Sequence, residues 1–351
     1  MGPRRVGLVA MNWREGPGVW DKQGNVASEL SRLLSGFRGR KLVVVGDLVA
    51  DNYVYGQTDR VSREAPVLVV RHESSEVTLG GAANAAANAR ALGAEVTTVG
   101  VLGRDEMGEA VRQRFAERGI RVVAVDAPFT ETKTRILAGG LNTSRQQMLR
   151  LDRGNVQPLP PALSARLRQA LEEAAKGADA VLVSDYGGGV VCDATRATLR
   201  HLAGGGVLVS ADSRYALGKL TGFRAAKPNE PELAALTGLP VEEDRALSRA
   251  VEEGLRLLDA QVLLVTRGRR GMALLERGGE VQLLGAHGSR AAVDVTGAGD
   301  TVMAAFTLGL AAGASARTAA ELANVAGALV VLKPGTAPVT AEELAAELGG
   351  R

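Results

Sequence analysis

The sequence predicts an α/β protein with a mostly parallel central sheet, helices on both faces of that sheet and a small separate β-sheet. Three observations carry this prediction. Short apolar segments typical of buried strands alternate with helical stretches along the 351 residues. Such alternation is typical of a parallel sheet that is covered on both faces. Two further stretches have the period-2 pattern of strands, with no helix between the strands.

The domain pattern begins near residue 39, with the buried-strand signature Lys41-Leu-Val-Val-Val-Gly-Asp47. We interpret residues 1–38 as an N-terminal appendage of unknown role, and residues 39–351 as the main domain. Later apolar strands are expected at 94–100, 180–185, 206–212 and 262–266. Ligands of such sheets bind at the carboxyl ends of the strands, where this chain carries Asp47, Asp185, Asp212 and Thr266.

The two period-2 stretches lie within about 53–78 and 129–152. They include Val67-Leu-Val-Val-Arg71 and Thr132-Lys-Thr-Arg-Ile-Leu137, in which side chains alternate between the two faces of a strand. We therefore predict that they form the small separate sheet.

The composition excludes several classes of function. A net charge of +3 without a Lys/Arg block argues against nucleic-acid binding. A single cysteine, Cys192, excludes an internal disulfide, and the three histidines are too scattered to indicate a metal cluster. No apolar run reaches the length of a membrane span, and the apolar N-terminal stretch lacks a small-residue cleavage site. The sequence favours a cytoplasmic protein with no membrane partner.

The segment Asp294-Val-Thr-Gly-Ala-Gly-Asp300 directly precedes an Ala/Leu-rich stretch that is expected to be helical. The first N–H groups of a helix are unpaired and carry the positive end of its dipole. The small residues Gly297, Ala298 and Gly299 would let these groups approach phosphate oxygens. Asp300 is then placed to accept the proton of a hydroxyl that attacks a bound phosphate. A bare glycine turn before a helix is the alternative, and the two flanking aspartates favour phosphoryl transfer.

Polar groups suited to a sugar occur near the front of the chain. Asp47 and Asp51 follow the first strand, and carboxylates accept strong, directional bonds from hydroxyls. The alternative is that one of them caps a turn or helix. Gly80 and Gly81 open an Ala-rich helix on which Asn84 would read a substrate; tight helix–sheet packing also explains the glycine at 81.

Two more groups of residues each allow two interpretations. Lys133, Arg135 and Arg150 suit a sugar phosphate, because guanidinium groups bind phosphate in a fork, but edge strands also favour solvated cations. Asn229 and Glu232 are three residues apart at an expected helix start. They suit Mg²⁺ held through its waters, and equally a helix capping box; the two uses are compatible.

The segment 294–300 and the earlier block 79–108 resemble the two signatures of the ribokinase-like (PfkB) carbohydrate kinases. The resemblance runs from about residue 40 to 340. It implies a ribokinase-like fold with Asp300 as catalytic base and Gly297, Ala298 and Gly299 as the anion hole. ATP and Mg²⁺ are the implied cofactors, with a monovalent cation left open. The resemblance also implies that the small sheet acts as a lid that covers the sugar and makes a homodimer contact. The implied nucleotide contacts are Asn229, Thr266, Arg267, Gly268, Gly271, Asp294 and Asn324.

Within that family, the chain looks similar to the D-glycero-β-D-manno-heptose 7-phosphate kinases. The strings that carry this likeness are Arg60-Val-Ser-Arg-Glu64, Lys133-Thr-Arg135, Gln146-Gln147, Arg150-Leu-Asp152 and Ser184-Asp-Tyr-Gly187. The likeness implies phosphorylation of the anomeric hydroxyl of the heptose phosphate, in the ADP-heptose route to lipopolysaccharide. The implied substrate contacts are Asp47, Asp51, Gly80, Gly81, Asn84, Lys133, Arg135, Arg150 and Asp185.

The chain departs from these kinases at several positions. Relatives commonly carry lysine where this chain has Gly188, and Asp-Pro-Lys where it has Asp212-Ser-Arg214. The His-x-Gly-His motif of the nucleotidyltransferase domain that follows in many relatives is absent, which predicts the kinase half alone. The alternatives are a kinase for ribose, fructose or fructose 6-phosphate, and an inactive nucleotide- or sugar-sensing module. The intact Asp294 and Asp300 disfavour a sensor.

Overall fold

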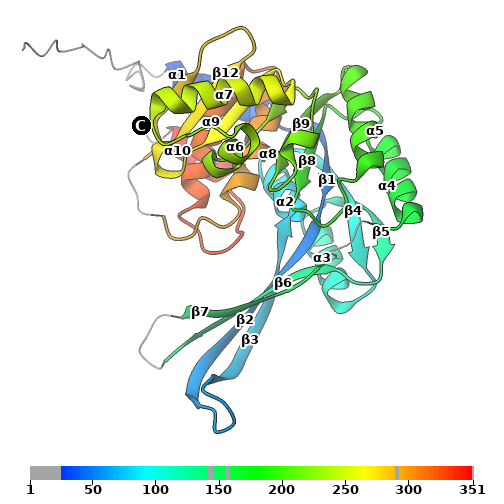
Figure 1. Ribbon diagram of the computed structural model, residues 1–351, viewed down its shortest axis with the longest axis vertical. Helices are drawn as coiled ribbons and strands as arrows, with labels where there is room; N and C mark the ends of the chain where they lie inside the picture. The colour runs from blue at the N-terminus through cyan, green and yellow to red at the C-terminus, as the bar shows by residue number, and fades with distance from the viewer. Residues whose placement is uncertain (1–24, 141–144, 155–158, 289–291, 350–351) are drawn as a thin grey trace, which may run out of the picture.

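The computed structural model describes residues 25–140, 145–154, 159–288 and 292–349. The first 24 residues of the predicted appendage therefore lie outside the described residues. A nine-stranded sheet forms the centre of the molecule, and a four-stranded sheet projects from the body (Figure 1).

The central sheet has the strand order β13-β12-β11-β10-β9-β8-β1-β4-β5. Its strands are β1 (Lys41–Gly46), β4 (Glu95–Gly103), β5 (Arg121–Ala127), β8 (Ala180–Asp185), β9 (Leu208–Ser213), β10 (Ala225–Ala226), β11 (Val262–Thr266), β12 (Met272–Glu276) and β13 (Gln282–Leu284). All neighbours from β5 to β11 pair in parallel, and β12 and β13 add antiparallel strands at one edge. The predicted mostly parallel sheet is confirmed.

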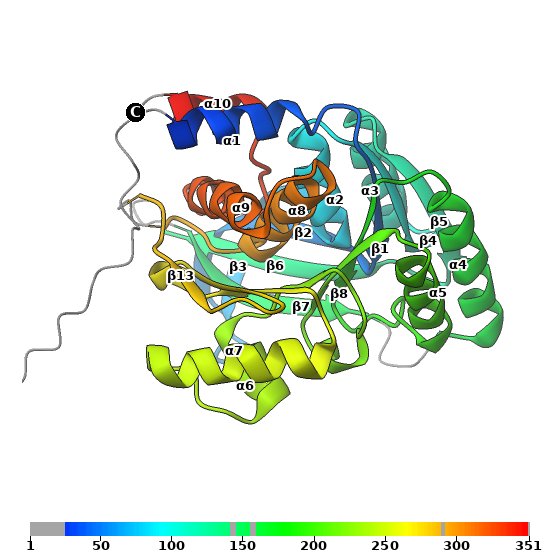
Figure 2. The ribbon, with the colours of Figure 1, turned by 90° about the horizontal axis from the view of Figure 1, so that it is seen from above.

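Helices cover both faces of this sheet (Figure 2). They are α1 (Asn25–Ser35), α2 (Ala82–Ala91), α3 (Glu106–Glu117), α4 (Pro161–Ala174), α5 (Asp193–Gly204), α6 (Glu230–Thr237), α7 (Asp244–Leu258), α8 (Ala298–Ala311), α9 (Ala316–Val330) and α10 (Ala341–Gly349). Side chains alternate across a strand, so Leu42 and Val44 of β1 enter the core with α1–α3 and α8–α10. Val43 and Val45 enter the opposite core with α4–α7.

The second sheet has the order β3-β2-β6-β7 and is hereafter called the lid. Its strands are β2 (Leu48–Val61), β3 (Leu68–Gly81), β6 (Glu131–Gly139) and β7 (Gln146–Arg153). The predicted separate sheet is thus confirmed. Its strands β2 and β3 extend beyond the expected 53–78 at both ends, which places Asp51 within the lid.

Strands β2 and β3 of the lid are joined to the body without linkers. A single residue, Asp47, separates β1 from β2, and β3 leads directly into α2. Residues 141–144 of the predicted second stretch lie outside the described residues.

The amphipathic stretch before the domain forms α1, which lies beside α10 (Figure 2). Leu30, Leu34 and Phe37 are buried in the helical layer. The described end of the predicted appendage is therefore packed against the domain. Within the described residues, none of the helices has both the length and the apolar character to cross a membrane.

Candidate active site

The turn before α8 is held in a conformation that only glycine adopts readily. Gly297 precedes the helix with φ of 76°, in the left-handed region. A Cβ at this residue would also collide with the side-chain nitrogen of Asn84. Asp294 braces the turn, because its carboxylate accepts the backbone N–H groups of Thr296 (2.9 Å) and Gly335 (3.0 Å). Burial opposes ionisation of Asp294, but these bonds outweigh it and lower its pKa.

Asp300 is the third residue of α8, and only 3% of it is exposed. Its Oδ2 accepts the side-chain N–H of Asn84 at 2.8 Å, and its Oδ1 accepts the hydroxyl of Tyr186 at 2.9 Å. Burial, aided by the charge of Asp212, raises the pKa of Asp300 to about 7, although both hydrogen bonds lower it. A carboxyl group with that pKa suits a general base near neutral pH.

A buried ion pair lies against the start of α8. The ammonium of Lys227 is 2.9 Å from Oδ2 of Asp212, and 3.4 Å from the position that a Cβ would take at Gly299. The first amides of the helix and this cation thus lie side by side, and both favour an anion.

Sequence reasoning missed both Lys227 and Tyr186 as site residues. Each stands in a string that had been noticed, Lys227 before Asn229 and Tyr186 directly after Asp185. For Tyr186 the available signal was its position at the carboxyl end of the strand predicted over 180–185. Lys227 follows β10, a two-residue strand that the sequence did not predict.

The strand-end carboxylates brace the loop after β8. Asp47 accepts the backbone N–H groups of Tyr186 (2.7 Å), Gly188 (3.1 Å) and Val190 (3.2 Å). Burial, with the charge of Asp185, raises the pKa of Asp47 to about 6, although these bonds lower it.

Asp185 is similarly engaged, with the N–H of Gly187 at 3.0 Å and the hydroxyl of Ser213 at 2.6 Å. Because Asp47 accepts backbone N–H groups of the loop after β8, the interpretation of a strand-end aspartate as a turn cap holds for Asp47.

Gly188 is enclosed by acidic groups. A Cβ there would collide with the carboxylate of Glu131 and lie 2.8 Å from Oδ1 of Asp47. Sequence reasoning did not single out Glu131, which opens β6 and lines a small cavity with Asp47 and Gly188. Burial, together with the charge of Asp47, raises the pKa of Glu131 to about 7.

The lid brings the predicted cations onto one face. Arg135 of β6 lies opposite Arg150 of β7 in the register, and Lys133 lies on the same face. Arg135 donates to Oδ1 of Asp51 at 2.6 Å, and the pair is buried. The backbone of Gly80 packs against the carboxylate of Asp51, where a Cβ would lie 2.6 Å from Oδ2.

The other two cations are engaged more loosely. Lys133 lies 5.0 Å above the ring of Tyr186. Arg150 forms a two-bond pair with Asp152 (2.8 and 2.9 Å) and is half exposed.

The predicted nucleotide side is built around the start of α6. Asn229 caps this helix in a capping box: Asn229 Oδ1 accepts the N–H of Glu232, and Glu232 Oε2 accepts the N–H of Asn229, both at 2.8 Å. Asn229 also forms a parallel bridge with Thr266 at the end of β11. The capping-box interpretation is thus confirmed. The described residues contain no group of three or more His, Cys, Asp or Glu side chains that could hold a metal ion.

The turn after β11 is fixed by ion pairs. Arg267 is buried and donates to Glu230 (3.0 Å) and Asp244 (2.7 Å), so its guanidinium joins the starts of α6 and α7. Gly268 and Gly271 both have positive φ in the short turn 268–271. Asn324 of α9 donates to the carbonyl of Gly285 at 2.7 Å and so holds the segment after β13.

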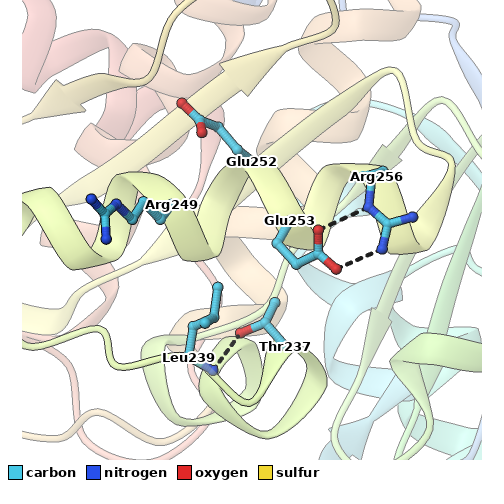
Figure 3. A pocket seen from close by; sticks show the side chains of 6 residues that line it. All are labelled: Thr237, Leu239, Arg249, Glu252, Glu253 and Arg256. Atoms are coloured by element: carbon cyan, nitrogen blue, oxygen red, sulfur yellow. Dashed lines mark hydrogen bonds and ion pairs between the residues drawn. The ribbon is translucent and has the colours of Figure 1, made fainter.

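A shallow surface depression of about 390 Å³ lies elsewhere, between α6 and α7 (Figure 3). It is lined by Thr237, Leu239, Arg249, Glu252, Glu253 and Arg256. It lies at the far end of α6 from Asn229, roughly 12 Å along the helix at 1.5 Å per residue. It includes none of the residues described above.

The buried carboxylate of Asp300 is placed to act as a base at the start of a helix that packs on an open α/β sheet, and a small β-sheet forms a lid beside it. This arrangement defines a sugar kinase of the ribokinase type. The family model for the pfkB family carbohydrate kinases matches residues 40–343, and the chain belongs to that family. Among its relatives, the bifunctional protein HldE of Caulobacter vibrioides is 40% identical over 327 residues, which cover 90% of this chain and 65% of that protein. The protein of the same name from Trichlorobacter lovleyi is 37% identical over 311 residues, which cover 87% and 62%. The chain thus spans less than two thirds of the length of these relatives.

Solved structures agree on the fold. A ribokinase of Arabidopsis thaliana, complexed with ribose and ATP, superposes with a TM-score of 0.68 at 23% identity, over 89% of this chain and 99% of that one. Phosphofructokinase-2 of Escherichia coli, in complex with substrates and products, gives 0.74 at 20% identity, over 89% and 100%. These structures confirm the predicted ribokinase-like fold, and the family match confirms the predicted carbohydrate-kinase class.

Proposed function

We propose that this chain transfers a phosphoryl group from ATP to the anomeric hydroxyl of D-glycero-β-D-manno-heptose 7-phosphate, giving the 1,7-bisphosphate. The observation that carries the proposal is the buried Asp300, whose pKa is raised to about 7 at the start of α8 beside Lys227. The choice of acceptor is supported by the HldE relatives at 37–40% identity and by the cations on the lid.

In the proposed reaction, Asp300 takes the proton of the attacking hydroxyl. The amides at Gly297, Ala298 and Gly299, with the ammonium of Lys227, favour the negative charge on the transferring group. ATP supplies the phosphoryl group when it is bound. Asn84 holds Asp300 in place through its hydrogen bond and, by this proposal, also contacts the acceptor.

We assign the 7-phosphate of the acceptor to the lid cations. Arg150 and Lys133 have the freedom to turn toward it, whereas Arg135 would bind it with the N–H groups that Asp51 does not use. Gly80, Gly81, Asp47, Asp51 and Asp185 complete the acceptor site; the engaged oxygens of Asp47 make its part chiefly that of shaping the loop 186–190.

We assign the nucleotide to the turn 266–271, with Thr266, Arg267, Gly268 and Gly271, and to Asp294 and Asn324. Mg²⁺ would be held through its waters by Asn229 and Glu232. The capping box uses Oε2 of Glu232, so Oε1 is the oxygen left for such a contact. A monovalent cation remains part of the proposal as a cofactor to be tested by potassium omission.

We also propose a homodimer formed through the outer face of the lid. Val54, Ile136, Leu149 and Leu151 share that face, and Leu149 and Leu151 are 56% and 63% exposed. Such an apolar patch is typical of a partner surface. Light scattering of Leu151→Glu tests this, because a monomer is expected from the variant.

We retain residues 39–351 as the kinase domain and propose that α1, from the segment before it, stabilises the domain.

The test of function is ADP release with Mg·ATP in the presence of heptose 7-phosphate, ribose, fructose or fructose 6-phosphate, followed by phosphorus NMR of the product. Formation of the 1,7-bisphosphate from the heptose alone is expected. Turnover of a different acceptor would keep the mechanism and replace the substrate. Silence with every sugar would favour a sensing module.

The role of Asp300 is tested separately with Asp300→Asn. We expect a folded protein whose turnover falls by roughly two to four orders of magnitude, the usual contribution of a general base. Turnover near that of the wild type would remove Asp300 from the mechanism.

A further inference from the structure

We propose that Asn88 is a positioning residue: it fixes the orientation of the Asn84 side-chain amide, so that Asn84 turns its nitrogen, and not its oxygen, toward Asp300. This inference rests on the proposed role of Asp300 as the base. Asn84 and Asn88 lie one turn apart on α2, and only 1% and 0% of them are exposed. Asn88 is not itself bonded to Asp300, and it meets the first turn of α8 at the hydroxyl of Thr301.

The orientation of Asn88 follows from two backbone groups that each have a single role. The N–H of Val339 can only donate, and it lies 3.4 Å from Oδ1 of Asn88. The carbonyl of Asn84 can only accept, and it lies 3.0 Å from Nδ2 of Asn88. Together they determine which end of the Asn88 amide is oxygen. The hydroxyl of Thr301 adds a third bond, at 2.8 Å from the same Oδ1.

The orientation of Asn84 then follows from that of Asn88. The Nδ2 of Asn88 also lies 3.1 Å from Oδ1 of Asn84, so this end of Asn84 must be the acceptor. Its Nδ2 is therefore left to face Asp300 at 2.8 Å and the carbonyl of Gly297 at 3.5 Å. The reverse orientation would place an amide oxygen against a carboxylate, two groups that only accept when the acid is ionised.

The consequence for Asp300 is electrostatic. The N–H of Asn84 stabilises the ionised form that accepts the proton from the acceptor hydroxyl. The other groups that face Asp300 are Tyr186 after β8, Asp212 on β9 and Lys227 after β10. None of these three is a hydrogen-bond partner of Asn88, so a change at Asn88 reaches Asp300 through Asn84 or through Thr301, which follows Asp300 on α8.

The test compares three variants of the full chain: Asn88→Ala, Thr301→Val and Thr307→Val. Thr301 and Thr307 are both fully buried on α8, and each has one short hydrogen bond to another side chain. Thr301 donates to Asn88, and Thr307 shares its bond with Ser210. Only the bond of Thr301 belongs to the series of hydrogen bonds that leads to Asn84. The measured quantity is the acid limb of the pH profile of kcat/KM, which reports the pKa of the essential base in the free enzyme.

We expect the acid limb of Asn88→Ala to move upward by about one pH unit, because Asn84 is no longer held to donate to the charged Asp300. From a pKa of about 7, kcat/KM should then fall about fivefold at pH 7 and about tenfold at pH 6. Thr301→Val should move the limb in the same direction by less. Thr307→Val should lower the melting temperature as much as Thr301→Val but leave the limb in place.

Folded Asn88→Ala with an unmoved limb and kcat/KM within about twofold of the wild type would overturn the proposal. An equal shift in Thr307→Val would also overturn it, since the effect would then be general loosening of α8. If Asn88→Ala does not fold, the comparison of the two threonine variants decides. Failure of the underlying function is distinguishable, because Asp300→Asn would then retain turnover whatever the Asn88 variant does.

Discussion

Replacing Asp300 by asparagine is expected to stabilise the folded chain at neutral and alkaline pH while it removes turnover. A carboxyl group whose pKa is higher in the folded than in the unfolded state holds its proton more tightly when the chain is folded. Here the pKa rises from 3.8 to about 7, chiefly through burial. Stability contributed by this group is therefore full below about pH 4, and it is lost as the pH rises to about 7.

The size of the effect follows from the shift. One pKa unit corresponds to about 1.4 kcal/mol, so a shift of about three units costs the folded wild type at most roughly 4 kcal/mol above pH 7. About two of these units are lost between pH 5 and pH 7. The advantage of Asp300→Asn over the wild type should therefore grow by about 2–3 kcal/mol between pH 5 and pH 8.

The assay is urea unfolding of both proteins at pH 5 and pH 8, followed by circular dichroism. The comparison between the two pH values removes the pH-independent effect of exchanging the hydrogen bonds to Asn84 and Tyr186. Asp193→Asn, at an exposed carboxylate in the first turn of α5, is the control for loss of any carboxylate. An advantage that is the same at both pH values, or equally pH-dependent in the control, would refute the reasoning.

Three further changes have defined outcomes. Arg150→Ala should raise KM for a phosphorylated acceptor by at least about tenfold with little change in melting temperature, since its pair is half exposed; an unchanged KM would exclude a phosphate contact. Lys227→Met should destabilise the chain by about 3–5 kcal/mol, because Asp212 is left buried without its partner; Lys227→Met combined with Asp212→Asn should recover stability in unfolding experiments but not ADP release. Gly297→Ala should abolish turnover, because its Cβ would collide with Asn84 beside the base. Gly313 has a similar positive φ but open space around it, so Gly313→Ala should lower the free energy of unfolding by only about 1 kcal/mol and leave the kinetics unchanged.

The sequence was sufficient for β1, β4, β8, β9 and β11, because these strands are short apolar runs that alternate with helices, a pattern that can be read without tertiary information. It did not predict β5, the two-residue β10 or the antiparallel edge strands β12 and β13. It was also sufficient for the turn at Gly297 and for the capping box at Asn229, since both are local and depend on residues within three positions. The lid strands were recognised from period 2, but β2 and β3 proved longer at both ends. Their ends enter the body, where burial on both faces removes the alternation.

The partners of the site residues could not be predicted in the same way. Asn84 contacts Asp300, 216 residues away in the chain, and Asp47 accepts N–H groups from residues 186–190. Arg135 looked like a free cation, but Asp51 neutralises it across two lid strands. Each pairing depends on which strands and helices become neighbours in the fold. The spacing of residues along the chain does not indicate which ones do.

The direct joints between the lid and the body bear on how this fold tolerates changes in length. Inserting one residue at the junction of β3 and α2 would turn the helix by about 100° and swing Asn84 away from Asp300. Insertions at the hairpin tip between Val61 and Leu68 would leave every joint unchanged. Descendants of this chain should therefore vary in loop length at the tip of the hairpin and remain invariant in length at its root.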